Sequence, residues 1–379
     1  NTYSGATMIN GGTLILPGNN TGAGATMVNT GKLIVVTGGS CSNSSVTVAN
    51  AATNVLQVVS PGGIWTCSNM TYGAGTTWVE FDFGTNALST TAASLQVRSN
   101  LAFNGTALNL TLRGIVAIPA GVYPLIQYGG TITNGAPPTT PFSLPVGLIA
   151  SLSNNVAGKS IDLVVTAGNE VKWGVGNGAW DVNTTFNWTN TGLGTLVTYL
   201  DGQIARFDDA AAGPSPIAVT LDTNVSPLSV IVSNAAMDYA ITGSGSIGGT
   251  AALQKQGAGT LSIGTTNTYV GGTVIAGGTL ALTGGGLCDT GAVLVTGGTL
   301  DLGSVNDSIG TLTLSSGSIT GTVGVLSPVS CTVNNASGET SISAILGGSG
   351  PLTKSAAGTL TLSGAAAYSG VTTLSGGTL

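Results

Sequence analysis

The segment from Leu253 to Leu282 reads LQKQGAGTLSIGTTNTYVGGTVIAGGTLAL and contains the phrase Gly-Thr-Leu twice, ending at Leu261 and at Leu280. The phrase returns with its last residue at Leu300, and three further copies end at Leu14, Leu360 and Leu379. A constant spacing of about 20 residues is the length of one rung of a parallel β-helix, in which three short strands and their corners make one coil. The spacing therefore predicts an all-β parallel solenoid.

The residues within each phrase alternate between aliphatic and small or polar side chains. In the two copies of the quoted segment, Leu261 and Ile263 flank a Ser, and Leu280 and Leu282 flank an Ala. This period of two points the aliphatic side chains inward and the small ones outward. Stacked rungs would then align the leucines in a core ladder, with about 2 kcal/mol for each fully buried side chain. The leucines predicted to form this ladder are Leu14, Leu33, Leu261, Leu280, Leu300, Leu360 and Leu379.

The composition agrees with a solenoid and excludes a disordered chain. Glycine accounts for 61 of 379 residues, and only 6% of residues are charged although 42% are hydrophobic. Disorder needs few hydrophobic residues and a high net charge, whereas the formal charge here is -6. Few charges suit a stacked fold, because identical charges about 4.8 Å apart would repel each other along a ladder.

The charge balance also limits the partners and the chemistry. With 8 Lys and Arg residues and a pI near 4.3, the chain offers no basic patch for nucleic acid. Histidine is absent, so the commonest general base and metal ligand is missing, and we expect no cofactor and no metal site. No window approaches ~18 uninterrupted apolar residues, so no membrane-spanning helix is expected. A chain that starts at Asn1 without Met or an apolar leader indicates a processed protein or an excerpt.

Four cysteines fall into one pair in each half of the chain, without the CxxC spacing of metal sites. If both members of a pair lie on neighbouring rungs, a disulfide can join them. The hypothesis is therefore two disulfides, Cys41 with Cys67 and Cys288 with Cys331.

The quoted segment closely resembles the autotransporter-associated β-strand repeat, also called the passenger-associated transport repeat. Residues Leu352 to Leu379, LTKSAAGTLTLSGAAAYSGVTTLSGGTL, look like a second copy, and Asn1 to Leu16 look like the latter half of a third. The resemblance implies a right-handed β-helical passenger of a large bacterial protein that is secreted or attached to the cell surface. It also implies an extracellular location for this stretch.

The regularity of the repeats suggests four regions. Residues 1–80 are expected to form regular rungs, and residues 81–170 a less regular solenoid with a Pro-rich excursion loop from Ala136 to Pro145. Residues 171–215 are expected to be a Trp-rich insertion or a junction between two helical stacks. Residues 216–379 return to a regular β-helix with the resembling repeats.

Two clusters could carry a site. Asp201, Asp208 and Asp209, with Arg206 nearby, form the best candidate for paired catalytic carboxylates, although such clusters are more often solvated loops or ion sites. Trp173, Trp180 and Trp188, with Asp181, could stack on sugar rings as a glycan contact. Such a set is more often a small packed core under a loop, because Trp buries a large area.

The leading functional hypothesis is a non-enzymatic structural protein, a β-helical stalk, fibre or sheath that is also adhesive. The ends of the chain resemble each other, since the Tyr-Ser-Gly and Gly-Gly-Thr-Leu motifs of residues 3–14 recur at residues 368–379. The expected partner is therefore the protein itself, by head-to-tail stacking or by tandem repetition in one long chain, with cell-surface or matrix glycans as further partners. The alternatives are a glycan-binding adhesin that uses the Trp cluster and a β-helical polysaccharide lyase or hydrolase.

Overall fold

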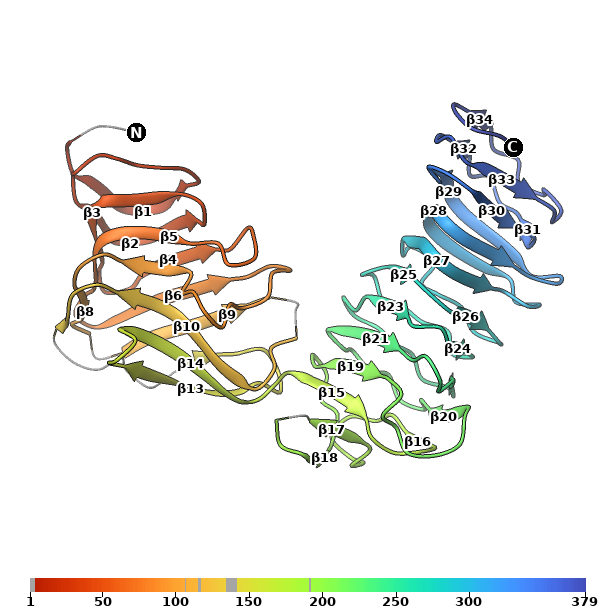
Figure 1. Ribbon diagram of the computed structural model, residues 1–379, viewed down its shortest axis with the longest axis horizontal. Helices are drawn as coiled ribbons and strands as arrows, with labels where there is room; N and C mark the ends of the chain where they lie inside the picture. Colours follow the sequence, from red (N-terminus) through yellow and green to blue (C-terminus); the bar gives the residue numbers. More distant parts are fainter. Residues whose placement is uncertain (1–3, 106, 115–116, 134–141, 191) are drawn as a thin grey trace. The chain divides into compact units, whose positions relative to one another are not determined.

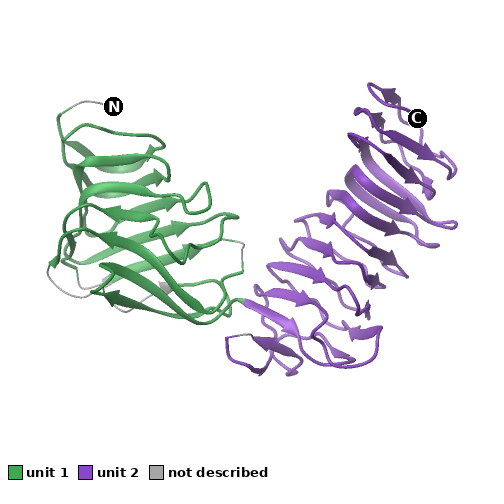
Figure 2. Ribbon diagram, in the orientation of Figure 1, with its two compact units in different colours: residues 1–169 green, residues 170–379 purple. Residues whose placement is uncertain are grey.

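The computed structural model describes residues 4–105, 107–114, 117–133, 142–190 and 192–379 (Figure 1). The chain divides into two compact units, residues 1–169 and residues 170–379 (Figure 2). The described residues contain no helix, about 51% of the chain is strand, and the strands coil into a solenoid of about 17 turns. The predicted all-β solenoid is therefore confirmed. Helices of the length and apolarity needed to cross a bilayer are likewise missing from the described ranges.

Unit 1, residues 1–169, is a stack of parallel rungs that ends in an antiparallel hairpin. Three columns of strands run through the stack: one starts with the first half of β1, one with its second half, and one with the bridge between Asn19 and Ser40. Its strands are β1 (Thr7–Leu16), β2 (Thr26–Val36), β3 (Ser40–Val48), β4 (Ala52–Gln57), β5 (Trp65–Tyr72), β6 (Thr76–Asp82), β7 (Leu95–Val97), β8 (Leu101–Phe103), β9 (Ala107–Arg113), β10 (Gly121–Tyr128), β11 (Ile132–Thr133), β12 (Phe142–Ser143), β13 (Ile149–Asn155) and β14 (Ser160–Ala167).

The hairpin of β13 and β14 closes unit 1. Strand β14 pairs antiparallel with both β13 and β10, whereas the other pairings among the described strands of the unit are parallel. Ile161 and Leu163 on β14 are buried and belong to the hydrophobic core of this unit. Of the Pro-rich stretch expected as an excursion loop, residues 136–141 lie outside the described residues.

Unit 2, residues 170–379, is a longer stack, in which the described residues form 20 strands against 14 in unit 1. Its strands are β15 (Glu170–Trp173), β16 (Gly178–Ala179), β17 (Trp188–Asn190), β18 (Thr195–Val197), β19 (Ile204–Phe207), β20 (Ile217–Thr220), β21 (Ser229–Ser233), β22 (Tyr239–Thr242), β23 (Leu253–Gln256), β24 (Thr260–Ile263), β25 (Thr273–Ile275), β26 (Thr279–Leu282), β27 (Val293–Asp301), β28 (Asp307–Thr320), β29 (Val325–Val333), β30 (Glu339–Ile342), β31 (Ile345–Leu346), β32 (Leu352–Lys354), β33 (Thr359–Leu362) and β34 (Thr372–Leu374).

The leucines of the Gly-Thr-Leu phrases stack in unit 2. Leu261 on β24 pairs with Leu280 on β26, which pairs with Leu300 on β27, and all three side chains are fully buried. The phrase that ends at Leu280 starts at a tight corner. Gly278 there has a φ of +61°, and a Cβ at this position would lie 2.3 Å from the carbonyl oxygen of Gly259. Only glycine fits this approach of one rung to the next.

Each unit has its own hydrophobic core, and the two sets of core residues do not overlap. The core of unit 2 starts in β15 to β18, where β17 pairs antiparallel with both β15 and β18, and extends through the parallel rungs. We call β15 to β18 the cap of unit 2. The division into four regions expected from the sequence stays a prediction, since the structure separates only these two units.

Candidate functional site

The three tryptophans singled out in the sequence lie together inside the cap of unit 2. The ring of Trp188 lies 5.1 Å from that of Trp173, at an interplanar angle of 85°, and 5.4 Å from that of Trp180. Tyr199 and Phe207 complete the cluster, at 5.6 and 5.4 Å from Trp188. Edge-to-face packing of this kind stabilises aromatic pairs beyond the area they bury. The cluster packs the cap against the first parallel rung.

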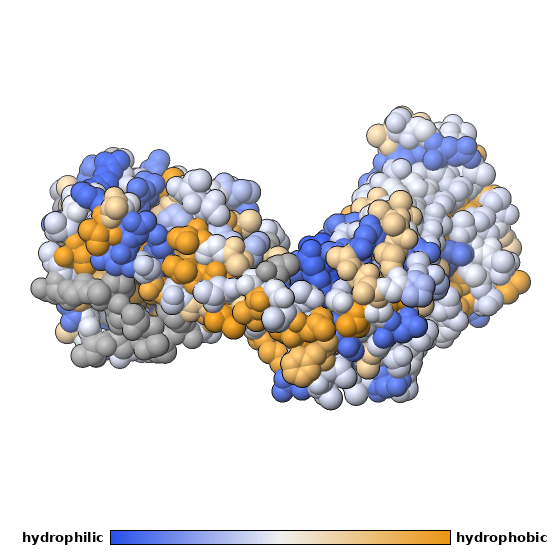
Figure 3. All heavy atoms as spheres, turned by 60° about the horizontal axis from the view of Figure 1, so that its bottom comes forward, coloured by the Kyte–Doolittle hydropathy of each residue, from blue (hydrophilic) through white to orange (hydrophobic). Residues whose placement is uncertain are grey.

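The burial of these rings corrects their proposed role in glycan contact. Trp173, Trp180 and Trp188 are all 0% exposed, so their faces are not available to stack on a sugar. The cap exposes hydrophobic side chains, including Phe186 at 64% and Leu196 at 45% exposure, beside polar ones such as Asn183. Figure 3 views this side and shows hydrophobic residues on the surface of the cap. The packed-core interpretation of the tryptophans is the one that the geometry supports.

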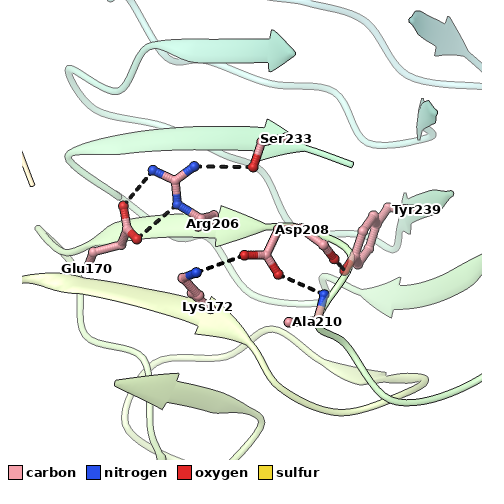
Figure 4. A network of polar contacts seen from close by, with 7 residues as sticks. All are labelled: Glu170, Lys172, Arg206, Asp208, Ala210, Ser233 and Tyr239. Atoms are coloured by element: carbon pink, nitrogen blue, oxygen red, sulfur yellow. Dashed lines mark hydrogen bonds and ion pairs between the residues drawn. The ribbon is translucent and has the colours of Figure 1, made fainter. Parts of the chain in front are cut away.

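A network of ion pairs ties the cap to the first rungs of unit 2 (Figure 4). Arg206 on β19 donates from Nε and Nη2 to the two carboxylate oxygens of Glu170 on β15, at 2.9 and 2.8 Å. Its Nη1 donates to Ser233 Oγ on β21, so one guanidinium joins three successive rungs. The carboxylate of Glu170 raises the pKa of Arg206. Bidentate pairs of this type are among the stronger ion pairs in proteins.

The aspartates of the candidate catalytic cluster have structural partners. Asp208 pairs with Lys172 at 2.9 Å, and Asp201 Oδ1 accepts a hydrogen bond from the backbone N–H of Ser226. Asp209 accepts from the backbone N–H groups of three consecutive residues, Ala235 to Met237, and these bonds, that of Met237 foremost, lower its pKa. A general acid would need a raised pKa instead. The geometry is that of a corner held between neighbouring rungs.

Two buried lysines, which the sequence reasoning missed, hold the corners of the repeats. Lys255 is 0% exposed, and its Nζ donates to the carbonyl oxygens of Gln256 and Gly257 at 2.8 and 3.0 Å. Burial lowers the pKa of Lys255 to about 8. Lys354, also 0% exposed, occupies the same position in the second copy and donates to the carbonyl of Ala356. A rare cation at the same place in LQK and LTK was the available signal.

The cysteines are four buried free thiols in this structure, which holds neither of the expected disulfides. Cys41 and Cys67 occupy directly paired positions on β3 and β5, and burial raises the pKa of both thiols. The register allows a bond between them, so this disulfide stays a prediction. Cys331 instead pairs with Leu312 and Leu352, and Cys288 lies in the corner before β27. The register does not bring these two together.

Asp307, at the start of β28, is a buried carboxyl that the sequence analysis did not single out. It is 7% exposed, and its Oδ2 accepts a hydrogen bond from the backbone N–H of Leu287 at 3.1 Å. Burial raises its pKa to about 6, and the neighbouring charge of Asp289 adds to this effect. Nowhere in the described part of the chain do three His, Cys, Asp or Glu residues converge into a group that could hold a metal ion.

Comparison with known proteins agrees with the repeat pattern. The family described as Passenger-associated-transport-repeat matches residues 1–16, 11–35, 253–282 and 352–379. A stretch of 144 residues is 37% identical to the Adhesin BmaC autotransporter of Brucella suis biovar 1 (strain 1330). The chain contains autotransporter-associated repeats.

The similarity of this repeat protein to the Brucella adhesin covers 37% of the chain and 4% of the relative's length. No solved structure matches the repeat protein. In the structure, the matched residues 253–282 form β23 to β26, and the matched residues 352–379 form β32 to β34. The family repeats are therefore two-rung pieces of the solenoid.

Proposed function

We propose that this repeat protein is a non-enzymatic, extracellular structural element, a β-helical stalk or fibre whose units join through their repeat rungs. The observation that carries the proposal is that the rung of residues 366–379 has the sequence pattern of residues 1–14. Residues of that pattern already have one stacking partner, since β1 pairs with β2 along its length. The similarity to a protein named as an autotransporter adhesin supports a surface location and an adhesive role.

The register of such a joint follows from the existing ladders. Thr7, Ile9 and Leu14 on β1 pair with Thr26, Val28 and Leu33 on β2. By the same rule, the equivalent residues of one copy, Thr372, Leu374 and Leu379, would lie over Thr7, Ile9 and Leu14 of the next. Leu374 and Leu379 are 53% and 47% exposed, so stacking would remove apolar surface from water.

Cysteine cross-linking tests the joint. Thr373 and Met8 are exposed and would become paired neighbours across it. The double variant Thr373→Cys with Met8→Cys, in a chain whose four native cysteines are replaced by Ala, should give a ladder of disulfide-linked oligomers under mild oxidation. The control Val329→Cys with Met8→Cys places an equally accessible thiol on a side of the solenoid and should not. Monomers only, or equal cross-linking in both variants, would reject the stacking proposal.

Adhesion is a separate part of the proposal and has its own test. Beads coated with the full chain should bind host-cell surfaces or matrix, and polysaccharides incubated with the chain should remain uncleaved. Released oligosaccharide that disappears in the variant Asp208→Asn would favour the enzyme alternative instead. Because neither assay depends on oligomers, adhesion and stacking can fail independently.

A further inference from the structure

Unit 1 contains a polar cavity of about 270 Å³ on the outer face of its closing hairpin. Strands β10 and β14 form its floor, and Thr90, Thr91 and Ala93 of the segment before β7 form a wall. Ser89 holds that segment, because its Oγ accepts hydrogen bonds from the backbone N–H groups of Thr91 and Ala92 at 3.2 and 3.0 Å. Hydrogen bonds within the segment therefore hold this wall in place.

The floor of the cavity is shaped by a break in the strand pairing. Pro124 on β10 pairs with Asp162 on β14, and the register shifts between Pro124 and Ile126. Proline has no N–H to donate, and an irregularity of this kind changes where the neighbouring side chains point. Ile161 and Leu163 turn into the core, whereas Asp162 lies on the opposite face and lines the cavity.

The carboxylate of Asp162 is the observation that points to a ligand. The residue is 4% exposed, and its Oδ2 accepts a hydrogen bond from Asn155 Nδ2 at 3.1 Å. Its other oxygen, Oδ1, is buried without a hydrogen-bond partner, and none of the ion pairs among the described residues includes Asp162. A buried carboxylate that is left incompletely paired destabilises the fold, so a donor that reaches this carboxylate from the cavity would be favoured.

The rest of the lining indicates the chemistry of that donor. Five further residues with hydrogen-bonding side chains surround the cavity, and two apolar residues, Val122 and Pro124, lie on one side. Hydroxyl groups can both donate and accept, and a pyranose ring also has an apolar C–H face. A calcium ion would need about 6–8 oxygen ligands, and Asp162 is the one carboxylate in the lining. The polar lining residues besides Asp162 are Thr90, Thr91, Gln127, Asn155 and Ser160.

We propose that this cavity binds a hexose residue of a glycan, with a sugar hydroxyl donating to the carboxylate of Asp162 and the C–H face of the ring against Val122 and Pro124. The lining residues belong to unit 1, and none of them lies in a stretch that the repeat family matches. Sugar binding here goes beyond the stacking function and does not depend on it.

Ligand-observed saturation-transfer NMR on the full chain tests this site, with free glucose, galactose, mannose and N-acetylglucosamine as probes. At least one of these sugars should receive saturation from the protein. Asp162→Asn keeps the shape but replaces one acceptor oxygen by an N–H donor, and we expect the affinity to fall by about tenfold or more, as for the loss of a hydrogen bond to a charged group. Thr91→Trp fills the cavity from an exposed position and should abolish binding.

Two controls keep the test decisive. Asp222→Asn removes one exposed carboxylate in unit 2 and should leave binding unchanged. Thermal unfolding of each variant reports whether the fold is intact. Absence of saturation transfer to all four sugars overturns the proposal, and so does binding that survives in both cavity variants. Stabilisation of the unsubstituted chain, but not of Asp162→Asn, by calcium alone would assign the cavity to a cation instead of a sugar.

Discussion

Along the chain, the regular rungs of unit 1 come before its irregular ones, whereas in unit 2 the irregular rungs come first. In unit 1, the rung that separates Ile9 from its partner Val28 is much shorter than the one that separates Tyr72 from its partner Phe103. In unit 2, the long rung separates Val171 from Ala205, whereas Val293 and Leu312 are one short rung apart. Regular rungs thus lie away from the closing hairpin of unit 1 and from the cap of unit 2. Long rungs occur where antiparallel strands must end or begin a stack.

The comparison also separates two ways of stabilising a solenoid. The regular rungs of unit 2 depend on aliphatic ladders such as Leu261, Leu280 and Leu300, which repeat at every turn. The cap depends on a single aromatic cluster around Trp188 and on the ion pairs of Arg206. Aliphatic ladders can be extended by adding rungs, whereas the aromatic cluster of the cap occurs once in unit 2.

The largest effect is expected from a charge inside a ladder. Leu280→Asp would place a carboxylate in a fully buried column, with no partner, and should cost more than about 4 kcal/mol and unfold the neighbouring rungs. Hydrogen exchange should show lost protection around β24 to β27. Ser262→Asp, which points outward between Ala240 and Ala281, is the matched control and should remain folded. Equal stability of the two variants would contradict the assigned inward face.

The next largest effect is expected in the cap. Trp188→Ala would leave a cavity among Trp173, Trp180 and Phe207 and should cost about 3–5 kcal/mol. Because each unit has its own core, loss of protection in hydrogen exchange should be confined to unit 2. Trp78→Ala on β6 of unit 1, where the ring is 37% exposed, should cost much less. If unit 1 loses protection together with unit 2, the two do not fold independently.

The buried carboxyl of Asp307 gives a smaller effect that depends on pH. Its pKa is about 6 in the folded chain against an ordinary value of 3.8, so between these values the unfolded state releases its proton first. Stability should therefore fall as the pH rises from 4 to 6, and Asp307→Asn should remove this dependence. At pH 7 the variant should be more stable by roughly 2 kcal/mol.

Urea denaturation at several pH values measures this difference. Asp289→Asn removes only the neighbouring charge, and should therefore give a change of the same sign but smaller. A variant Asp307→Asn that follows the same pH profile as the unsubstituted chain would show that this carboxyl is not the titrating group.

The smallest effect compares one ion pair in each unit. The side chains of Arg206 and Glu170 are 23% and 18% exposed, whereas that of Arg113, paired with Glu80 in unit 1, is 64% exposed. Arg206→Gln should cost about 1–2 kcal/mol, and Arg113→Gln less than about 0.5 kcal/mol. Denaturation midpoints at low and high salt provide the measurement. A larger loss for Arg113→Gln would reverse the proposed ranking of cap and rung.

The sequence predicted the solenoid because its regular rungs repeat a phrase at constant spacing. Leu261, Leu280 and Leu300 could be placed in one column from that spacing alone. The rung from Val48 to its partner Tyr72 and the next one, from Tyr72 to Phe103, differ in length, so their stacking could not be read in the same way.

The candidate sites depend on contacts that spacing does not encode. The tryptophans were visible in the sequence, but their burial depends on the antiparallel pairing of β17 with β15 and with β18. The position of Lys255 was visible too, yet its role depends on the direction in which corner carbonyls point. Asp162 gave no signal, because its isolation arises from a register shift opposite Pro124.

The buried lysines bear on how the chain would survive outside a cell. Trypsin cuts after Lys and Arg, and the chain contains 8 such residues, of which only Lys255 and Lys354 follow Arg206. Both are 0% exposed, with their ammonium groups bound inside the corners of their rungs. Residues 207–379 therefore present no accessible tryptic site while folded. The scarcity of charge that lets the ladders stack also makes this part of the protein resistant to a common class of digestive enzyme.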